Sequence, residues 1–209
     1  MARRSAPEVN AGSMADIAFL LLIFFLVTTT IEIDSGIPSK LPPPIEDDVE
    51  PPLLKERNIF QVLVNQNDQL QVNEELTEIE DLTDMAVAFL DNGGGTEARN
   101  ACNYCQGEKD PESSDNPNKA VISLVNDRQA SYRMYMTVTN ELVRAYTILR
   151  NREGKRLYGE TFESMTKRLE DFPETEKESP EYEELEEQIE EVRKLFPRKL
   201  SEAEPQNRD

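Results

Sequence analysis

A single carboxylate lies at the start of an unbroken apolar run. Asp16 precedes Ile17 to Val27, which are all apolar, and no other segment of the 209-residue chain is hydrophobic enough to enter a bilayer. The stretch from Gly12 to Ile31 has about twenty residues, enough for a helix to cross roughly 30 Å of hydrocarbon. Asp16 therefore falls inside a predicted membrane span.

Two roles suit a carboxylate at this place. An ionised Asp at the centre of a membrane helix costs about 2.5 to 3.5 kcal/mol on insertion scales, so such a residue is normally part of a proton or ion path. An Asp at the membrane surface can instead cap the helix, where the positive end of the helix dipole stabilises it. The span alone does not decide between these two roles.

Cys102 and Cys105 form a lone C-x-x-C pair in a polar, glycine-rich segment. A structural zinc site needs four ligands, and the chain offers no second cysteine pair and no histidine. A redox motif needs a helix N-terminus to lower the thiol pKa, and none is evident here. We expect a small loop disulfide; free thiols, or a four-thiolate metal site shared by two chains, are the alternatives.

Composition excludes several classes of function. Without histidine the chain lacks the usual general base and the commonest metal ligand, and it has no phosphate-binding glycine motif. We therefore expect no enzyme activity, no cofactor and no metal. The chain carries 23 Lys and Arg against 42 Asp and Glu, a net charge of −19, so we expect no nucleic-acid partner.

The charges that flank the apolar run predict its orientation. Arg3 and Arg4 precede it and acidic residues follow it, so we place residues 1–11 in the cytoplasm and residues 12–33 in the membrane. The remaining residues then lie beyond the membrane. In a bacterial inner membrane this side is the periplasm, an oxidising compartment.

A cleaved signal peptide is the alternative explanation of an apolar run of this length. The segment before the run is long and only weakly positive, and Asp16 directly abuts the apolar core. The residues after Val27 offer no small-x-small cleavage site. These features favour an uncleaved single-pass anchor.

Residues 34–57 contain six prolines among acidic residues, a composition that favours extended backbone. We interpret this segment as a tether, and a plain spacer accounts for most of it. Only the element at 37–42 indicates docking to a partner, through Ile37, Leu41 and Pro42.

Residues 58–150 predict a small α+β domain in which helices pack on one face of a β-sheet. An inserted loop at 91–118 interrupts it, and Ser131 is a candidate N-cap. Hydrophobic periodicity places the elements in the order strand, strand, helix, strand, helix, at residues 58–64, 69–72, 78–90, 119–125 and 132–149.

Residues 151–209 form an acidic extension that we expect to be mainly helical. Its apolar residues recur at spacings of three and four, at positions 182, 185, 189, 192 and 196. This stripe lasts only about two heptads, too short for a credible coiled coil, so we expect it to dock on the domain. Residues 199–203 are a candidate final strand.

The sequence V-N-A-G-S-M-A-D-I-A-F-L-L-L-I-F-F at residues 9–25 resembles the membrane signature of the ExbD/TolR family. The I-P-S-K-L-P element at 37–42 is similar to the Leu-Pro element that the family carries just beyond its helix. The segment from Val125 through Tyr132 to Tyr146 is similar to the strand, Asp, Tyr and helix pattern of its periplasmic domain. The resemblance covers most of residues 9–150.

This resemblance implies a subunit of an inner-membrane motor driven by protons. Two copies of the chain would thread a ring of a multi-span ExbB/TolQ-type partner, and an ExbD-like motor would energise a TonB-type protein that opens outer-membrane receptors. Asp16 matches the proton-carrying Asp of the family. Three apolar residues share its face at helical spacing and would seal the path: Leu20, Ile23 and Val27. Two polar residues, Ser13 and Thr28, would line the two ends of the path. These five are the predicted channel-facing residues.

Other interpretations stay open. A TolR-like role in envelope integrity is the closest rival, and a passive membrane-anchored adaptor would use Asp16 only as a cap. A flagellar-type stator needs a peptidoglycan-binding domain, which the sequence does not indicate. The chain also departs from the family pattern: Ser13 or Met14 stands where many relatives have Pro, the 91–118 loop is inserted, and residues 151–196 exceed the compact family core.

Overall fold

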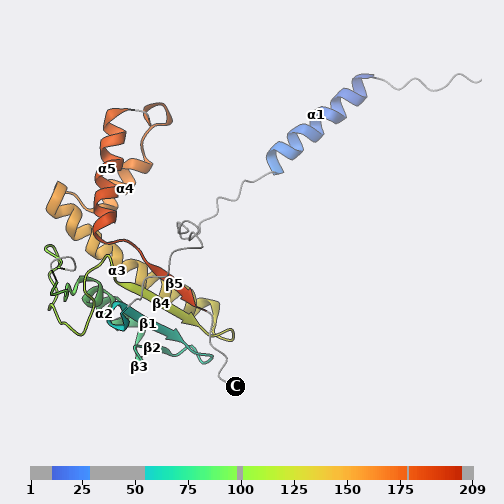
Figure 1. Cartoon of the computed structure of the whole chain (residues 1–209). Coiled ribbons are helices and arrows are strands. Elements are labelled where there is room, and N and C mark those ends of the chain that lie inside the picture. The colour runs from blue at the N-terminus through green and yellow to red at the C-terminus, as the bar shows by residue number, and fades with distance from the viewer. Residues whose placement is uncertain (1–10, 29–54, 98–100, 178, 204–209) are drawn as a thin grey trace, which may run out of the picture. The chain divides into compact units, whose positions relative to one another are not determined.

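The computed structural model describes residues 11–28, 55–97, 101–177 and 179–203 (Figure 1). The chain divides into two compact units, Met1–Glu50 and Pro51–Asp209. The first unit contributes one described helix, and the second contains the sheet and all other described elements.

The helix of the first unit, α1 (Ala11–Thr28), exposes apolar side chains all around its axis. Phe19, Leu20 and Phe25, which point in three different directions at 100° per residue, are each about 60% exposed. Within the described residues, no helix combines the length and apolarity that a bilayer crossing requires. The predicted membrane segment, residues 12–33, continues past Thr28 into residues that lie outside the description.

The second unit is built on a mixed five-stranded sheet with the order β3-β2-β1-β4-β5. β1 pairs antiparallel with β2 and β2 with β3, whereas β4 runs parallel to both β1 and β5. The strands are β1 (Ile59–Val64), β2 (Leu70–Val72), β3 (Glu75–Thr77), β4 (Val121–Asn126) and β5 (Leu200–Ala203). The predicted α+β fold is confirmed, and so is its opening hairpin.

β3 was not predicted from the sequence. It is a short edge strand with polar residues, and it follows β2 after a two-residue turn at Asn73 and Glu74, both of which have positive φ. Two consecutive residues with positive φ are typical of a type I′ hairpin turn, which usually contains glycine. Because Asn73-Glu74 lacks glycine, the local sequence gave no turn signal.

Two helices cover the buried face of the sheet. α2 (Ile79–Asp91) and α3 (Tyr132–Tyr158) pack against each other, and the strands alternate buried and less buried residues, as expected for a sheet covered on one side. Ser131 caps α3, since its hydroxyl accepts a hydrogen bond from the Met134 N–H at 3.1 Å. The cap confirms the predicted helix start. The main core is formed by residues from β1, β2, β4, α2 and α3 together with Phe196.

α3 is longer than the periodicity predicted. It continues past Leu149 to Tyr158 and ends at Gly159, which has φ 74° and so adopts the left-handed conformation of a helix C-cap. The extra turns have charged residues on their inner face, where Glu153 is fully buried. Hydrophobic periodicity cannot detect such turns.

The acidic extension folds back on the same unit. α4 (Phe162–Glu170) and α5 (Pro180–Leu195), joined through the short 3-10 helix η2 (Glu174–Glu176), pack on the end of α3 (Figure 1). They enclose a second apolar cluster, made of Phe162, Met165, Leu185, Ile189 and Val192. The candidate final strand is present as β5, parallel to β4.

A buried ionic cluster joins α2 to the end of α3. Arg152 donates two hydrogen bonds to the Asp91 carboxylate, at 2.5 and 2.8 Å, and a third to Glu153 at 3.0 Å. Arg156 binds the other carboxylate oxygen of Glu153 at 2.6 Å. The side-chain hydrogen bonds to Asp91 raise the pKa of Arg152 above its ordinary value.

The inserted loop contacts the extension through Tyr104. Its hydroxyl donates to the carbonyl of Leu195 at 2.8 Å, and its ring packs edge-on against Phe196 at 5.5 Å. Burial, together with the negative charges of Glu153 and Asp91, raises the pKa of Tyr104 to about 12. The loop, α3 and the extension therefore form one connected structure.

Removing the central cation of the ionic cluster should destabilise the domain strongly. In Arg152→Met the largely buried Asp91 loses its cation and the buried Glu153 keeps only Arg156, so we expect a loss of roughly 3 kcal/mol of unfolding free energy. The control is Arg193→Met, which removes an exposed pair with Glu190 and should cost about 1 kcal/mol or less. Urea unfolding of the full chain in detergent measures both; equal losses in the two variants would contradict a special role of the cluster.

Alkaline pH should destabilise the domain through its buried tyrosines. The folded state raises the pKa of Tyr104 and Tyr146 to about 12, so their contribution to stability is complete below their ordinary pKa of 10 and is lost as the pH rises from 10 towards 12. Melting temperatures measured from pH 8 to pH 11.5, with phenolate absorbance, test this. In Tyr104→Phe the melting temperature should fall less steeply above pH 10. The lost hydrogen bond should also lower the unfolding free energy by about 1 kcal/mol at neutral pH. The exposed Tyr132→Phe should leave the decline as in the wild type.

Candidate functional site

Asp16 is the sixth residue of α1 and lies in its second turn. The first turn holds no acidic residue. Capping and the helix dipole act on groups at the helix end and within the first turn. From its place in the described helix, Asp16 is therefore poorly positioned to serve as an N-cap.

On the face of α1 that carries Asp16, the described residues that follow it are apolar. Leu20 and Ile23 follow it at spacings of four and seven residues and are 58% and 41% exposed. A helix that is apolar all round is normally buried in a membrane or in a larger assembly. Such surroundings would place the carboxylate of Asp16 in a medium of low polarity.

Asp16 is the only ionisable residue of α1. A lone carboxyl group can bind one proton and release it, but a path needs a donor and an acceptor on its two sides. α1 supplies neither of these groups from its ionisable side chains. A proton path through Asp16 would therefore need water or ionisable groups from outside this helix.

Several predicted site residues cannot be located. Ser13, Val27 and Thr28 belong to α1, but their side chains lie outside the description. Ile37, Leu41 and Pro42, the predicted docking element, fall entirely in residues that the structure does not describe. Their roles stay predictions.

The two cysteines are joined in a disulfide, Cys102–Cys105, with a Cα–Cα distance of 5.5 Å. Both are largely buried, and the loop packs tightly against them. A Cβ atom on Gly93, which has φ 65°, would lie 2.7 Å from the Cβ of Cys105, so only glycine fits there. The disulfide braces the start of the inserted loop against the end of α2.

The inserted loop is also tied to the chain segment that enters the sheet. Asp115, whose side chain is fully buried, accepts hydrogen bonds from Arg57 and from Asn58, the latter at 3.3 Å. The backbone N–H of Asp115 in turn donates to the Asn58 side chain at 2.8 Å. Arg57 and Asn58 belong to the 3-10 helix η1 (Glu56–Asn58), just before β1.

Sequence reasoning did not identify these polar clusters. Asp91, Asp115, Arg152 and Glu153 are residue types that are mostly solvated, and no local spacing distinguishes the buried ones. Their partners lie far away in sequence: Asp91 and Arg152 are 61 positions apart, and Arg57 and Asp115 are 58 apart. Only co-variation among relatives would have signalled these pairs.

Comparison with known families assigns the larger part of the chain. The family described as biopolymer transport protein ExbD/TolR matches residues 2–150, which include α1, the sheet up to β4 and most of α3. No curated protein matches the chain. α4, α5 and β5 lie beyond the matched residues.

Proteins of this family are non-enzymatic subunits of transport motors that are anchored in the inner membrane. They work with partners of the ExbB/TolQ and TonB/TolA kinds. The match covers well over half of the sequence, from the second residue to α3. The chain belongs to the ExbD/TolR family of biopolymer transport proteins.

Proposed function

We propose that this chain is the ExbD-like subunit of a proton-driven motor that energises TonB-dependent transport across the outer membrane, with Asp16 as the proton carrier. The observation that carries this proposal is the setting of Asp16: one carboxylate in a helix that is apolar on every side, within the residues matched to the family. Intramembrane carboxylates are expensive and are retained where they bind protons or ions.

The anchor in this proposal is α1 extended to Ile31. The described helix has 18 residues, and the predicted span adds residues that follow Thr28. The N-terminus then lies in the cytoplasm and the second unit in the periplasm. The disulfide at Cys102–Cys105 supports this orientation, because disulfides persist in the periplasm and are rare in the cytosol.

The proposed mechanism depends on two environments for one carboxyl group. A dry environment favours its neutral form, whereas water or a polar partner group favours its charged form. A motion of α1 that alternates between the two would load a proton from one side of the membrane and release it to the other. Moving one elementary charge through 100 mV is worth about 2.3 kcal/mol, which can bias such a motion.

The remaining residues of this face would control access to the carboxyl group. Leu20, Ile23 and Val27 would seal the path on one side of Asp16, because an apolar helix face excludes water. Ser13 and Thr28 would offer polar contacts towards its ends. The donor and acceptor groups would come from the surrounding ring of an ExbB/TolQ-like partner that holds two copies of this chain.

Motion of α1 would reach the periplasmic domain through the proline-rich segment 34–57. Extended proline-rich backbone is semi-rigid, so it transmits displacement better than a flexible linker. We assign the docking of a TonB-like protein, or of the ring, to Ile37, Leu41 and Pro42. A TolR-like role would use the same motor with a TolA-like partner, and the proteins that co-purify separate the two.

Asp16→Asn should abolish energised transport while leaving assembly intact. Asn is nearly isosteric with Asp but cannot ionise, so the complex should form and carry no protons. The measurement is receptor-dependent uptake in cells, together with the yield of the ExbB/TolQ-like protein that co-purifies in mild detergent. Asp84→Asn, which removes an exposed carboxylate on α2, is the matched control and should retain uptake.

Uptake at the wild-type level in Asp16→Asn would refute the proton-carrier role. A chain that purifies alone or only with soluble proteins would instead favour the passive anchor. Recovery of a TolA-like protein and no TonB-like protein would move the chain to the envelope-integrity motor.

A further inference from the structure

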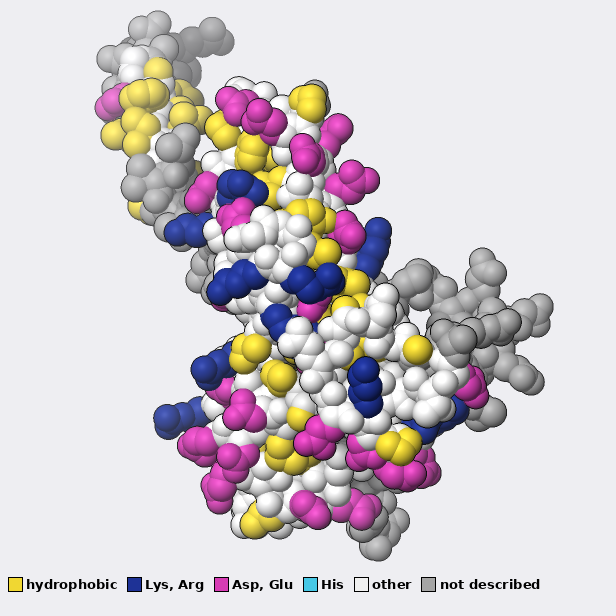
Figure 2. Space-filling view, turned by 90° about the vertical axis from the view of Figure 1, so that its left-hand side faces the viewer, with side chains coloured by type: hydrophobic (Ala, Val, Ile, Leu, Met, Phe, Trp, Pro, Cys, Tyr) yellow, Lys and Arg dark blue, Asp and Glu magenta, His cyan; other side chains and the backbone are white. Residues whose placement is uncertain are grey.

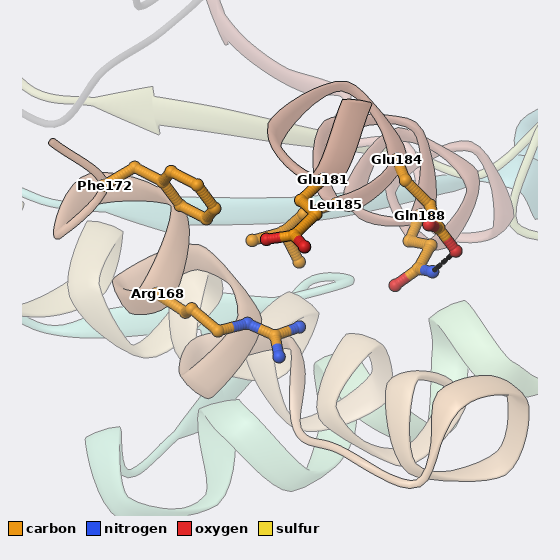
Figure 3. Close-up of a pocket in the computed structure, with 6 residues that line it drawn as sticks. All are labelled: Arg168, Phe172, Glu181, Glu184, Leu185 and Gln188. Carbon is orange, nitrogen blue, oxygen red and sulfur yellow. Dashed lines mark hydrogen bonds between the residues drawn. The ribbon is translucent and has the colours of Figure 1, made fainter. Parts of the chain in front are cut away.

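A groove of about 330 Å³ lies between α4 and α5, outside the residues that match the family. Its two apolar lining residues are Phe172, which follows the end of α4, and Leu185 of α5. Figure 3 shows the six lining residues, of which Arg168, Glu181, Glu184 and Gln188 are polar. The volume is at the lower end of the range for ligand pockets, roughly 300 to 1,000 Å³.

Packing beneath the groove fixes its shape. Leu185 is 4% exposed and belongs to the apolar cluster that holds α4 and α5 together. The Phe172 ring packs edge-on against Tyr182 at 5.5 Å, which positions it at the rim. Thr161 and Ser179 cap the two helices through their side chains. A site that is formed before its ligand arrives loses less conformational entropy on binding.

The wall formed by α5 is strongly negative. α5 contains seven glutamates and two basic residues, and both basic residues are in its last turn. Among the described residues, no ion pair joins Glu181 or Glu184 to a cation; Glu184 accepts only a hydrogen bond from Gln188 at 3.2 Å. The one cation of the groove, Arg168, is paired with Glu160 at 3.1 Å.

The surface around the groove has the same character. Figure 2 shows acidic side chains gathered beside hydrophobic ones over the α4 and α5 end of the second unit. Acidic patches attract cations and repel anions over roughly a Debye length, about 8 to 10 Å at physiological salt. The surface therefore disfavours acidic peptides, nucleic acids and anionic lipids, and it favours a basic ligand.

We propose that the α4–α5 groove binds a basic peptide segment of a partner protein that carries a large apolar side chain. The apolar side chain inserts between Phe172 and Leu185, and flanking lysines or arginines pair with Glu181 and Glu184. The Gln188 amide is placed to bond the peptide backbone at the same rim. This site does not depend on proton transport at Asp16, so either proposal can fail alone.

The test measures binding of a short fluorescein-labelled peptide of alternating lysine and leucine to the full chain in detergent. Fluorescence polarisation at low salt should give micromolar binding. Glu181→Gln with Glu184→Gln should weaken binding about fivefold to tenfold, because two rim charges are lost. The matched control is Glu183→Gln with Glu186→Gln, which removes equal charge from α5 residues that do not line the groove, and it should change affinity less than twofold.

Two further measurements separate insertion in the groove from general charge attraction. A peptide with serine in place of leucine should bind at least about tenfold more weakly, since it loses the apolar anchor. The methyl NMR signal of Met165, which is in the same apolar cluster as Leu185, should shift on binding, and that of Met134 in the first turn of α3 should not.

Several results would overturn the proposal. If the two double glutamine variants weakened peptide binding equally, or if the leucine and serine peptides bound equally well, the binding would be nonspecific charge attraction. Tighter binding of a glutamate–leucine peptide would reverse the predicted charge. If a second copy of the chain occupied the groove, it would exclude the peptide. Gln188→Arg would then disrupt this association and lower the oligomer mass measured by sedimentation.

Discussion

The second unit depends on the parallel pairing of β1 with β4. All six residues of β1 pair in register, from Ile59 with Val121 to Val64 with Asn126. Parallel neighbours require a crossover that returns the chain to the same end of the sheet, and here α2 and the inserted loop form it. β5 joins β4 in the same direction, so a second crossover is needed, and α3, α4 and α5 form that one. The insertion and the extension are therefore parts of the two crossovers of the sheet.

Charged residues hold these two crossovers together. Asp91 ends α2, Arg152 and Glu153 lie near the end of α3, and Tyr104 of the insertion reaches Leu195 at the end of α5. A buried charge is costly unless it is paired, which makes each arrangement specific even where its net stabilisation is small. The disulfide and the Asp115 contacts restrain the same loop from its other side. This interlocking explains why a loop with almost no regular structure is well packed.

α1 obeys a different constraint. Its described side chains are apolar apart from Asp16 and are exposed around the helix, a pattern that is normal for a helix buried in a membrane or a larger assembly. Its one ionisable group is the carboxylate of Asp16. The family match extends from this helix into the second unit, as far as α3. The α4–α5 groove lies beyond that match and is a separate candidate binding site.

The sequence alone determined those features whose signals are local. Alternating and helical periodicity located β1, β2, α2, β4 and the start of α3, because side chains that face one core repeat at the period of the element. Asp16 stands out in the same way, because the apolar run that follows it is visible in the sequence; its role stays a prediction. The tertiary structure decided the rest: the polar strand β3, the last turns of α3, the burial of Glu153 and the groove between α4 and α5. β3 pairs locally with β2, but through a turn without glycine that its sequence did not reveal. The other three features depend on residues farther along the chain, whose energetic contribution exists only once folding has brought them into contact.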